Sequence, residues 1–338
     1  MFDQIFKSFE GIHAAVVGDV MLDTYWWGDT NRISPEAPVP VVAVKGKEYR
    51  IGGAGNVALN LRSLGARVSM HTATGTDEDG LLLEIMMKEK GIDTASVWKS
   101  DDRLTTNKIR IISRNQHLLR LDYEVADDLE PEKEQRFIEK TLTAFEADPP
   151  QVVIFEDYNK GVLTERVIES LLGWCRQRGV LTAVDPKKRN FFAYQQVDIF
   201  KPNLKEAKEA LNLLEVQTSA EGMQAVHQQL KERLQHRISL VTLSEKGVFY
   251  TDGTEPNLIP AHVRSIADVS GAGDTVIAVA ALAFAATHDL HLAAEMANLA
   301  GGLVCEEVGT VAIDAGKLLE ECNRLLSDNR PSVQLIDG

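Results

Sequence analysis

The chain has 338 residues, of which 44% are hydrophobic, and a formal net charge of −14, which suits one large soluble α/β domain or two smaller ones. An acidic chain lacks the basic surface that replaces counterions on phosphates, so we expect no nucleic-acid partner. The longest apolar run, residues 275–288, is too short for a membrane span, and no basic leader with an apolar run opens the chain. We expect a cytoplasmic protein without a membrane partner, with Cys175, Cys305 and Cys322 as reduced thiols.

The N-terminal part predicts a short amphipathic helix, a buried strand ending near Gly18, and then a polar loop punctuated by prolines. A β-prone stretch over 39–51 follows, with a turn at Lys45–Lys47. Residues 95–124 predict short, partly polar strands with a turn at Arg114–Gln116. We expect segments 31–51 and 95–124 to form a small exposed sheet, a lid, on a single domain over residues 1–338.

From residue 131 onward helical patterns alternate with apolar strands, which predicts a mostly parallel sheet with helices on both faces. The predicted helices cover residues 131–147, 164–178, 204–213 and 220–235. Ligands of such sheets bind beyond the carboxyl ends of the strands. Polar groups follow five predicted strand ends, and we expect them to converge at one edge: Gly18–Asp19, Glu156–Asp157, Asp185–Lys187, Lys201–Asn203 and Ser244–Lys246.

The segment "DVSGAGDTV", residues 268–276, carries the strongest chemical signal. Gly271, Ala272 and Gly273 are small and open an apolar helix, so their N–H groups and the helix dipole face an anion. Asp274 in that first turn is placed to accept a hydroxyl proton during phosphoryl transfer. A purely structural alternative is a helix start with Ser270 as the N-cap and Asp274 complementing the dipole.

This segment resembles the second signature of the PfkB, or ribokinase-like, carbohydrate kinases, and "GGAGNVALNLRSLG" resembles the first. "KPNLKEA" contains the N-x-x-E of the family, and the resemblance runs from the first strand to about Thr310. It implies a ribokinase-like fold, with Asp274 as the catalytic base and the N–H groups of residues 272–274 as the anion hole. A helix N-terminus lowers the pKa of an acid, and a depressed pKa of Asp274 would cost little, because phosphoryl transfer depends more on positioning and charge neutralisation than on base strength.

The resemblance further implies ATP with Mg²⁺. Glu206, with Asn203, is expected to organise the Mg²⁺ through water, although Asn203 and Glu206 also match a plain capping box. The expected nucleotide contacts are Asn203, Ser244, Lys246, Gly247 and Asn298. Some relatives hold a monovalent cation such as K⁺ near the positions of Asp268, Ser270 and loop 305–310, which makes K⁺ a further candidate cofactor.

Sugar recognition is expected from residues at the start of the body and in the lid. The candidates for the hydroxyl groups are Asp19, Asp23, Gly52, Gly53, Asn56 and Asp185. Arg110 and Arg120, with Lys187 from the body, are the candidates for a phosphate group, because arginine pairs with phosphate in a bidentate manner. The alternative is that these charged strand residues face water.

A narrower resemblance concerns residues 16–42 and 108–122, which look like the kinases of bacterial ADP-heptose synthesis. It implies phosphorylation of the anomeric hydroxyl of D-glycero-β-D-manno-heptose 7-phosphate, a precursor of the lipopolysaccharide core. Many such kinases are fused to a nucleotidyltransferase with an H-x-G-H motif, which we do not find, so no such domain is expected. By analogy with the family we expect a homodimer through the lid.

Three alternatives remain open. One is a related kinase for fructose, ribose, adenosine or a fructose phosphate. Another is a NAD-dependent Rossmann oxidoreductase, since Gly53, Gly55 and Ala58 fit G-x-G-x-x-A; it requires an apolar strand before Gly52, and "KGKEYRI" is charged. The third is an inactive sugar sensor, which the presence of base, anion hole and N-x-x-E disfavours.

Overall fold

Eight strands form the central sheet in the computed structural model, which describes residues 1–114, 116–262 and 264–326. Their order is β14-β13-β12-β11-β10-β9-β1-β4. All pairs from β4 to β12 are parallel, and β12, β13 and β14 pair antiparallel. The strands are β1 (His13–Gly18), β4 (Arg67–His71), β9 (Val152–Glu156), β10 (Leu181–Asp185), β11 (Ile199–Phe200), β12 (Ile238–Thr242), β13 (Val248–Thr251) and β14 (Asn257–Ile259).

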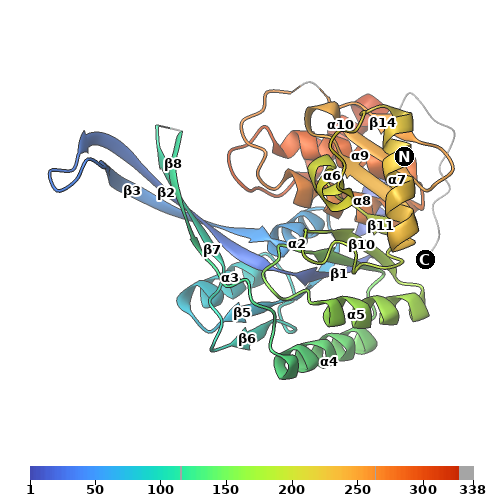
Figure 1. Cartoon of the computed structure of the whole chain (residues 1–338), viewed down its shortest axis with the longest axis horizontal. Helices are drawn as coiled ribbons and strands as arrows, with labels where there is room; N and C mark the ends of the chain where they lie inside the picture. The colour runs from blue at the N-terminus through green and yellow to red at the C-terminus, as the bar shows by residue number, and fades with distance from the viewer. Residues whose placement is uncertain (115, 263, 327–338) are drawn as a thin grey trace.

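Helices cover both faces of this sheet (Figure 1). Strand β1 shows why: Ala14 and Val16 pack into one apolar cluster, and the alternate residues Ala15 and Val17 pack into the other. The first cluster includes α1 (Phe2–Phe9), α2 (Ala54–Ser63), α3 (Glu78–Glu89), α8 (Ala272–Thr287), α9 (Leu290–Val304) and α10 (Ala315–Leu326). The second includes α4 (Pro131–Ala147), α5 (Glu165–Arg178), α6 (Leu204–Leu211) and α7 (Ala220–Leu234). The expected α/β class with a mostly parallel sheet is confirmed.

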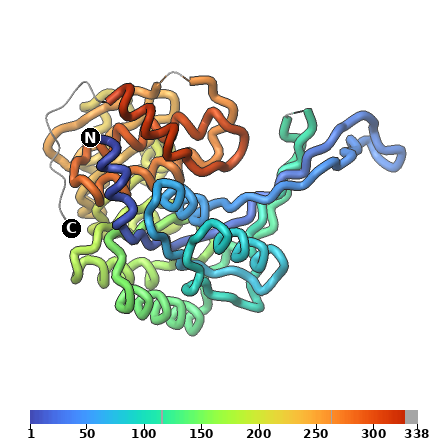
Figure 2. The backbone as a smooth tube through the Cα atoms, turned by 180° about the vertical axis from the view of Figure 1, so that it is seen from behind, coloured from blue at the N-terminus to red at the C-terminus, as the bar shows by residue number. Residues whose placement is uncertain are grey.

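A second sheet of four strands, in the order β3-β2-β7-β8, extends from the body as an arm (Figures 1 and 2). We call it the lid; its strands are β2 (Val20–Ile33), β3 (Pro40–Gly53), β7 (Asn107–Ser113) and β8 (Gln116–Tyr123). β2 and β7 pair parallel, and the outer strands pair antiparallel with them. The lid strands therefore start at Val20, well before the expected residue 31.

Three local expectations about the lid are wrong. The predicted polar loop after the first strand is largely β2. The predicted turn at Lys45–Lys47 is a β-bulge within β3, because Trp27 pairs with Gly46 and Gly28 with Val44, which leaves Lys45 unpaired. Residues 98–100 form β6, which pairs with β5 (Ala73–Gly75) in a separate sheet. A turn does join β7 to β8, although Asn115 lies outside the described residues.

Two further expectations concern chemistry rather than fold. Cys175, Cys305 and Cys322 are free and buried, as expected. Among the described residues, no helix combines the length and apolar character that crossing a membrane requires.

Candidate active site

Asp274 lies in the first turn of α8, where the carboxyl ends of the parallel strands meet. Gly271 precedes the helix with φ of 80°, a left-handed conformation that glycine adopts without strain. A Cβ at Gly271 would lie 2.7 Å from Nδ2 of Asn56, so a larger residue does not fit here. The N-cap is Gly271 rather than Ser270, whose hydroxyl donates to Asp268 at 2.9 Å. The N–H of Ala272 donates to the carbonyl of Val269 at 3.3 Å, whereas the amides of Gly273 and Asp274 lie in the first turn of α8, where a helix offers them no carbonyl.

The carboxylate of Asp274 is held by two donors. Nδ2 of Asn56 donates to Oδ2 at 2.9 Å, and the hydroxyl of Tyr158 donates to Oδ1 at 2.8 Å. Asp274 is only 3% exposed. Burial raises its pKa to about 6, against the lowering effect of the two hydrogen bonds. The expected depression by the helix N-terminus is wrong, because the cost of desolvating the carboxylate exceeds it.

Asp185, at the end of β10, is the centre of a charged network beside the anion hole. Its Oδ1 pairs with Nζ of Lys187 at 3.0 Å and its Oδ2 with Nζ of Lys201 at 2.9 Å. Burial raises the pKa of Asp185, but the two ammonium groups outweigh that effect and the net shift is downward. A Cβ built on Gly273 would lie 3.5 Å from Asp185 Oδ2. The network therefore lies against the first turn of α8.

The N-x-x-E residues join this network through Lys187. Nζ of Lys187 lies 2.8 Å from Oε1 of Glu206. Oε2 of Glu206 accepts the N–H of Asn203, and Oδ1 of Asn203 accepts the N–H of Glu206, both at 2.8 Å. The capping box is thus present. Lys187, expected at the sugar phosphate, instead connects Asp185 to Glu206.

Glu156, at the end of β9, lies beside Asp185 and Asp274. It is fully buried, and neither of its carboxylate oxygens has a hydrogen-bond partner among the described residues. Glu156, Asp185 and Asp274 each present an oxygen within 4.8 Å of the others. Burial, followed by repulsion from Asp185 and Asp274, raises the pKa of Glu156 well above its usual range.

The lid contributes a cationic face. Nη1 of Arg110 pairs with Oδ1 of Asp23 at 2.6 Å, and Thr310 Oγ1 donates to Oδ2 of Asp23 at 3.1 Å. A Cβ at Gly52 would lie 2.3 Å from Asp23 Oδ2, so only glycine allows this approach. Arg120 lies directly across the ladder from Arg110 and pairs with Asp122 at 2.8 Å. The Arg110 side chain is 11% exposed, whereas that of Arg120 is 56% exposed. Of the two arginines, only Arg120 therefore faces water, which was the alternative to phosphate binding.

Lys108 of the lid lies close to Tyr158, the residue that binds Asp274. Its Nζ lies 5.2 Å from the ring centroid of Tyr158, and Nζ of Lys187 lies 5.4 Å from the same centroid. Burial lowers the pKa of Lys108. Asp23 opposes this shift, and the nearby cations Lys160, Arg120 and Arg110 add to it. Cations that repel one another in a partly buried place favour an anionic ligand.

The carboxylate of Asp19 is occupied by hydrogen bonds from the backbone of the body. Its side chain accepts the N–H groups of Tyr158, Lys160 and Val162, at 2.9, 3.0 and 3.2 Å. Its carbonyl accepts the N–H of Ala54 at 3.0 Å, next to Gly53, which precedes α2. Asp19 therefore fastens the loop that carries Tyr158 to the start of α2.

The remaining nucleotide candidates lie around β12 and α9. Ser244 and Lys246 form an exposed 3₁₀ turn (Ser244–Lys246) followed by Gly247, and Lys246 Nζ donates to Thr218 Oγ1 at 3.0 Å. Asn298 is buried in α9, and its Nδ2 donates to the carbonyl of Pro260 at 2.9 Å. Asp268, a candidate for the monovalent cation, accepts the N–H groups of Ser270 and Gly309, at 3.0 and 2.9 Å.

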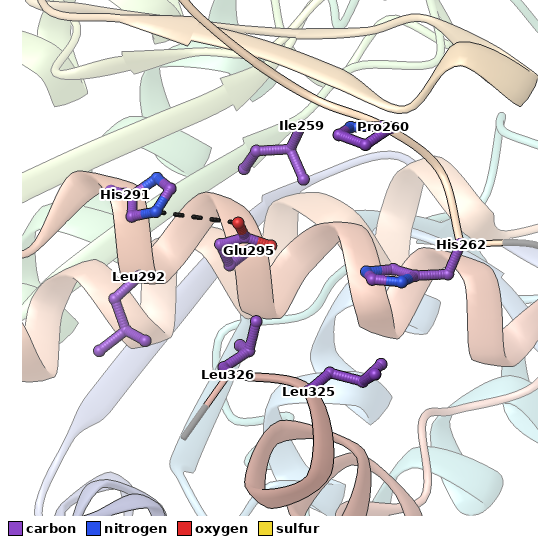
Figure 3. A pocket seen from close by; sticks show the side chains of 8 residues that line it. All are labelled: Ile259, Pro260, His262, His291, Leu292, Glu295, Leu325 and Leu326. Atoms are coloured by element: carbon purple, nitrogen blue, oxygen red, sulfur yellow. Dashed lines mark ion pairs between the residues drawn. The ribbon is translucent and has the colours of Figure 1, made fainter. Parts of the chain in front are cut away.

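A cavity of about 170 Å³ lies elsewhere, between β14, α9 and α10 (Figure 3). Its walls are mostly apolar, and its polar groups include the His291–Glu295 pair, at 3.8 Å. The full lining is Ile259, Pro260, His262, His291, Leu292, Glu295, Leu325 and Leu326. None of these residues was predicted to bind sugar or nucleotide.

Sequence reasoning missed Tyr158 and Thr310 as site residues and named Glu156 and Lys201 only as groups at strand ends. Tyr158 lies two residues beyond the end of β9, and this position was the available signal. Its contact with Asp274 depends on the tertiary placement of α8. Thr310 had no local signal, since its role comes from contact with the lid residue Asp23.

Comparison with known proteins decides the family. A model of the pfkB family carbohydrate kinases matches residues 12–315. The chain belongs to this family. It is a carbohydrate kinase by family, and in this kinase a buried acid at the start of α8 lies beside a Lys–Asp–Lys network.

Relatives of this pfkB family kinase include "Bifunctional protein HldE" of Geotalea uraniireducens, 37% identical over 99% of this chain and 68% of the relative. The HldE protein of Geobacter sulfurreducens is 37% identical over 94% of this chain and 64% of the relative. The chain thus spans about two thirds of the length of these relatives.

Solved structures show the same fold. Phosphofructokinase-2 from Escherichia coli, in complex with potassium, superposes with a TM-score of 0.76 at 16% identity, over 93% of this chain and 99% of the other. Ribokinase from Arabidopsis thaliana, complexed with ribose and ATP, gives a TM-score of 0.70 at 16% identity, over 91% of this chain and 99% of the other. The ribokinase-like fold expected from the sequence is confirmed.

Proposed function

We propose that this kinase transfers the γ-phosphoryl group of ATP to the anomeric hydroxyl of D-glycero-β-D-manno-heptose 7-phosphate, giving the 1,7-bisphosphate for ADP-heptose and lipopolysaccharide core synthesis. The observation that carries the proposal is the cationic face of the lid, where Lys108 contacts the ring of the tyrosine that holds the base. A phosphate on the acceptor is the ligand that such a face fits. Relatives named HldE and the resemblance of residues 16–42 and 108–122 to ADP-heptose kinases support the choice of sugar.

Asp274 accepts the proton of the attacking hydroxyl in this proposal. With its pKa raised to about 6, the carboxylate is ionised at neutral pH yet more basic than an ordinary aspartate. Asn56 and Tyr158 fix its orientation, so one oxygen lone pair is directed to the acceptor. The amides of Ala272, Gly273 and Asp274 stabilise the charge on the transferred group.

The phosphates of ATP are assigned to the network beside α8. Lys187 and Lys201 supply positive charge there, and Asp185 and Glu206 hold the Lys187 ammonium in place. Ser244, Lys246, Gly247, Asn203 and Asn298 are the proposed contacts for the rest of the nucleotide. Their placement beyond β11 and β12 and on α9 is consistent with this role.

Magnesium fits the donor set at this edge, which consists of carboxylates. Both oxygens of Glu206 are engaged, by the Asn203 N–H and by Lys187, so we assign Glu206 to hold Mg²⁺ through water. Mg²⁺ neutralises phosphate charge when it is bound. A monovalent ion such as K⁺ near Asp268 is a further part of the proposal.

A homodimer through the lid completes the proposal. Residues on alternate positions of β8 show why: Arg120 and Asp122 share the cationic face, whereas Leu119 and Leu121 lie on the opposite face, and both leucines are exposed. An exposed apolar face next to an edge strand is normally covered. A cytoplasmic location is proposed on the three free cysteines.

A panel of acceptors with ATP tests the proposal. The panel contains both anomers of heptose 7-phosphate, fructose 6-phosphate, fructose, ribose and adenosine, with the position of the new phosphate read by NMR. We expect turnover of the β-anomer of heptose 7-phosphate and a new phosphate on C1. Turnover of an unphosphorylated sugar without turnover of heptose 7-phosphate contradicts the assignment. Sedimentation at micromolar concentration tests the dimer.

A further inference from the structure

Arg50, near the end of β3, binds a loop of the body and so joins the lid to it. Its Nη1 donates to the carbonyl of Val308 at 2.6 Å and to that of Thr310 at 3.3 Å. Its Nε donates to Oε1 of Glu48 at 2.6 Å. The guanidinium is therefore held on two sides, by the loop and by its own strand. Several N–H donors in one plane allow a single arginine to make these bonds together.

Tyr25 of β2 makes a second contact with the same loop. Its hydroxyl accepts the N–H of Thr310 at 3.3 Å, and its buried ring lies 4.9 Å from Cζ of Arg50. Gly309 of the loop has φ of 75°, and a Cβ there would lie 2.7 Å from both Nη1 of Arg50 and the hydroxyl oxygen of Tyr25. Only glycine therefore lets the loop approach the lid this closely.

The loop also contacts the segment that begins α8. The N–H of Gly309 donates to Oδ2 of Asp268 at 2.9 Å, and Oδ1 of Asp268 accepts the N–H and the hydroxyl of Ser270. A Cβ at Gly271, the residue before α8, would lie 3.2 Å from Cγ2 of Thr310. The loop therefore lies between the lid and the turn whose amides are assigned to the transferred phosphoryl group.

The lid end of these contacts is the pair of residues assigned to the acceptor. Asp23 accepts the hydroxyl of Thr310 at 3.1 Å and Nη1 of Arg110 at 2.6 Å. Arg50 pairs with Asp23 between β3 and β2, so both side chains project from one face of the lid. Asp23 and Asp268 are thus joined through two neighbouring residues of one loop. A displacement of that loop changes both ends together, because packed and hydrogen-bonded groups do not deform independently.

We propose that Arg50 is a positioning residue for phosphoryl transfer, which acts through Gly309 and Asp268 on the first turn of α8. The inference rests on the proposed role of that turn as the anion hole. The bonds of Arg50 go to loop carbonyls and to Glu48 rather than to the side chains assigned to ATP or to the acceptor. Arg50 should therefore affect the rate of transfer more than the binding of either substrate, since misplaced amides stabilise the transition state less well.

Steady-state kinetics of Arg50→Gln test the proposal, with ATP and heptose 7-phosphate as substrates. We expect kcat to fall about tenfold while both KM values change by less than about twofold. Arg50→Lys keeps a donor toward the carbonyls and should recover part of the loss. Arg114→Gln is the matched control, because it also removes an arginine of the lid, whose bond goes to Asn31 within the lid, and it should behave like the parent.

A double-mutant cycle shows whether Arg50 acts through Asp268. In that case kcat of the double variant Arg50→Gln, Asp268→Asn should be close to that of the slower single variant, because both substitutions break the same connection. All members of the cycle are measured at one KCl concentration, since Asp268 is also assigned to K⁺. Losses that multiply in the double variant overturn the proposal.

Hydrogen exchange followed by mass spectrometry tests the same inference without turnover. In the full, nucleotide-free chain, residues 268–276 should exchange at least about threefold faster in Arg50→Gln than in the parent and in Arg114→Gln. Circular dichroism and the melting temperature check that the variants fold. If Arg50→Gln does not fold, Tyr25→Phe takes its place, because it removes only the acceptor of the Thr310 N–H, and the same results are expected.

Three results overturn the role of Arg50. They are an unchanged kcat, a KM for the acceptor that rises at unchanged kcat, and equal exchange of residues 268–276 in the parent and in a folded variant. The exchange readout does not depend on the acceptor, so it stands even if heptose 7-phosphate is not turned over. The kinetics are then measured with the acceptor that the panel identifies.

Discussion

The hydroxyl of Tyr158 donates a hydrogen bond to Oδ1 of Asp274 at 2.8 Å, while the ring of the same tyrosine lies 5.2 Å from Nζ of Lys108 and 5.4 Å from Nζ of Lys187. One residue therefore contacts the proposed base, the lid and the network assigned to the ATP phosphates. Backbone amides of the loop that carries it bind Asp19, so its position is fixed from the body. The position of Lys108 in the lid is therefore linked through Tyr158 to the orientation of the base.

Tyr158→Phe removes this hydrogen bond and keeps the ring. Because the bond lowers the pKa of Asp274, its loss should raise that pKa above about 6. We expect kcat to fall about tenfold and the acidic limb of the pH profile of kcat/KM to move to higher pH. Tyr194→Phe is the matched control, since Tyr194 donates to Asp157 at 2.8 Å instead. A limb that stays in place in Tyr158→Phe contradicts the role of Tyr158.

Asp274→Asn replaces the proposed base by an amide of the same shape. We expect turnover to fall by about 10²- to 10⁴-fold, because an amide does not accept the proton of the acceptor hydroxyl. ATP binding, followed by calorimetry, should persist, since Lys187 and Lys201 keep their partners Asp185 and Glu206. An unchanged kcat would remove Asp274 as the base.

Substitutions of Arg110 and of Arg120 should have different effects, although the two residues are paired between β7 and β8. Arg110→Lys keeps a charge beside Asp23 but loses the planar fork that binds phosphate, so the KM for a phosphorylated acceptor should rise about tenfold at unchanged KM for ATP. Arg120→Gln should have a smaller effect, because Arg120 is exposed and paired with Asp122. Arg114→Gln, at the exposed end of the lid, is the control. Equal effects in all three variants speak against a phosphate subsite at Arg110.

Residues within short motifs could be predicted from the sequence, because their relations are local. Gly271 and Asp274 share one helical turn, and Asn203 and Glu206 form a capping box over one turn of α6. The contacts between Asn56, Tyr158 and Asp274 come from elements more than a hundred residues apart. They follow from the order of strands in the sheet, which no local pattern encodes.

The lid shows a second limit. Gly28, Asp29 and Thr30 are residue types found in turns, yet they lie in β2, because their strand projects from the body and their pairing with β3 supplies the hydrogen bonds. Partial exposure removes the alternation by which half-buried strands are recognised. The pKa of Asp274 illustrates the same point for electrostatics: the helix N-terminus was visible in the sequence, and the burial that outweighs it was not.

Buried histidines make stability depend on pH. Burial lowers the pKa of His71 and of His236 to about 3, and that of His227 to about 4. Since these values lie below the unfolded value of 6.5, the unfolded chain binds more protons than the folded chain below pH 6.5, and stability is lost as the pH falls from there toward 3. Each such histidine should cost about 2 kcal/mol between pH 8 and pH 5. Urea unfolding at the two pH values measures this loss.

His236→Gln should lose less stability on acidification than the parent, although it is less stable at pH 8 because its bond to Ser239 changes. His117→Gln, in exposed β8, is the matched control and should follow the parent. If the free energy of unfolding of His236→Gln falls as steeply as that of the parent, His236 is not a source of the acid sensitivity.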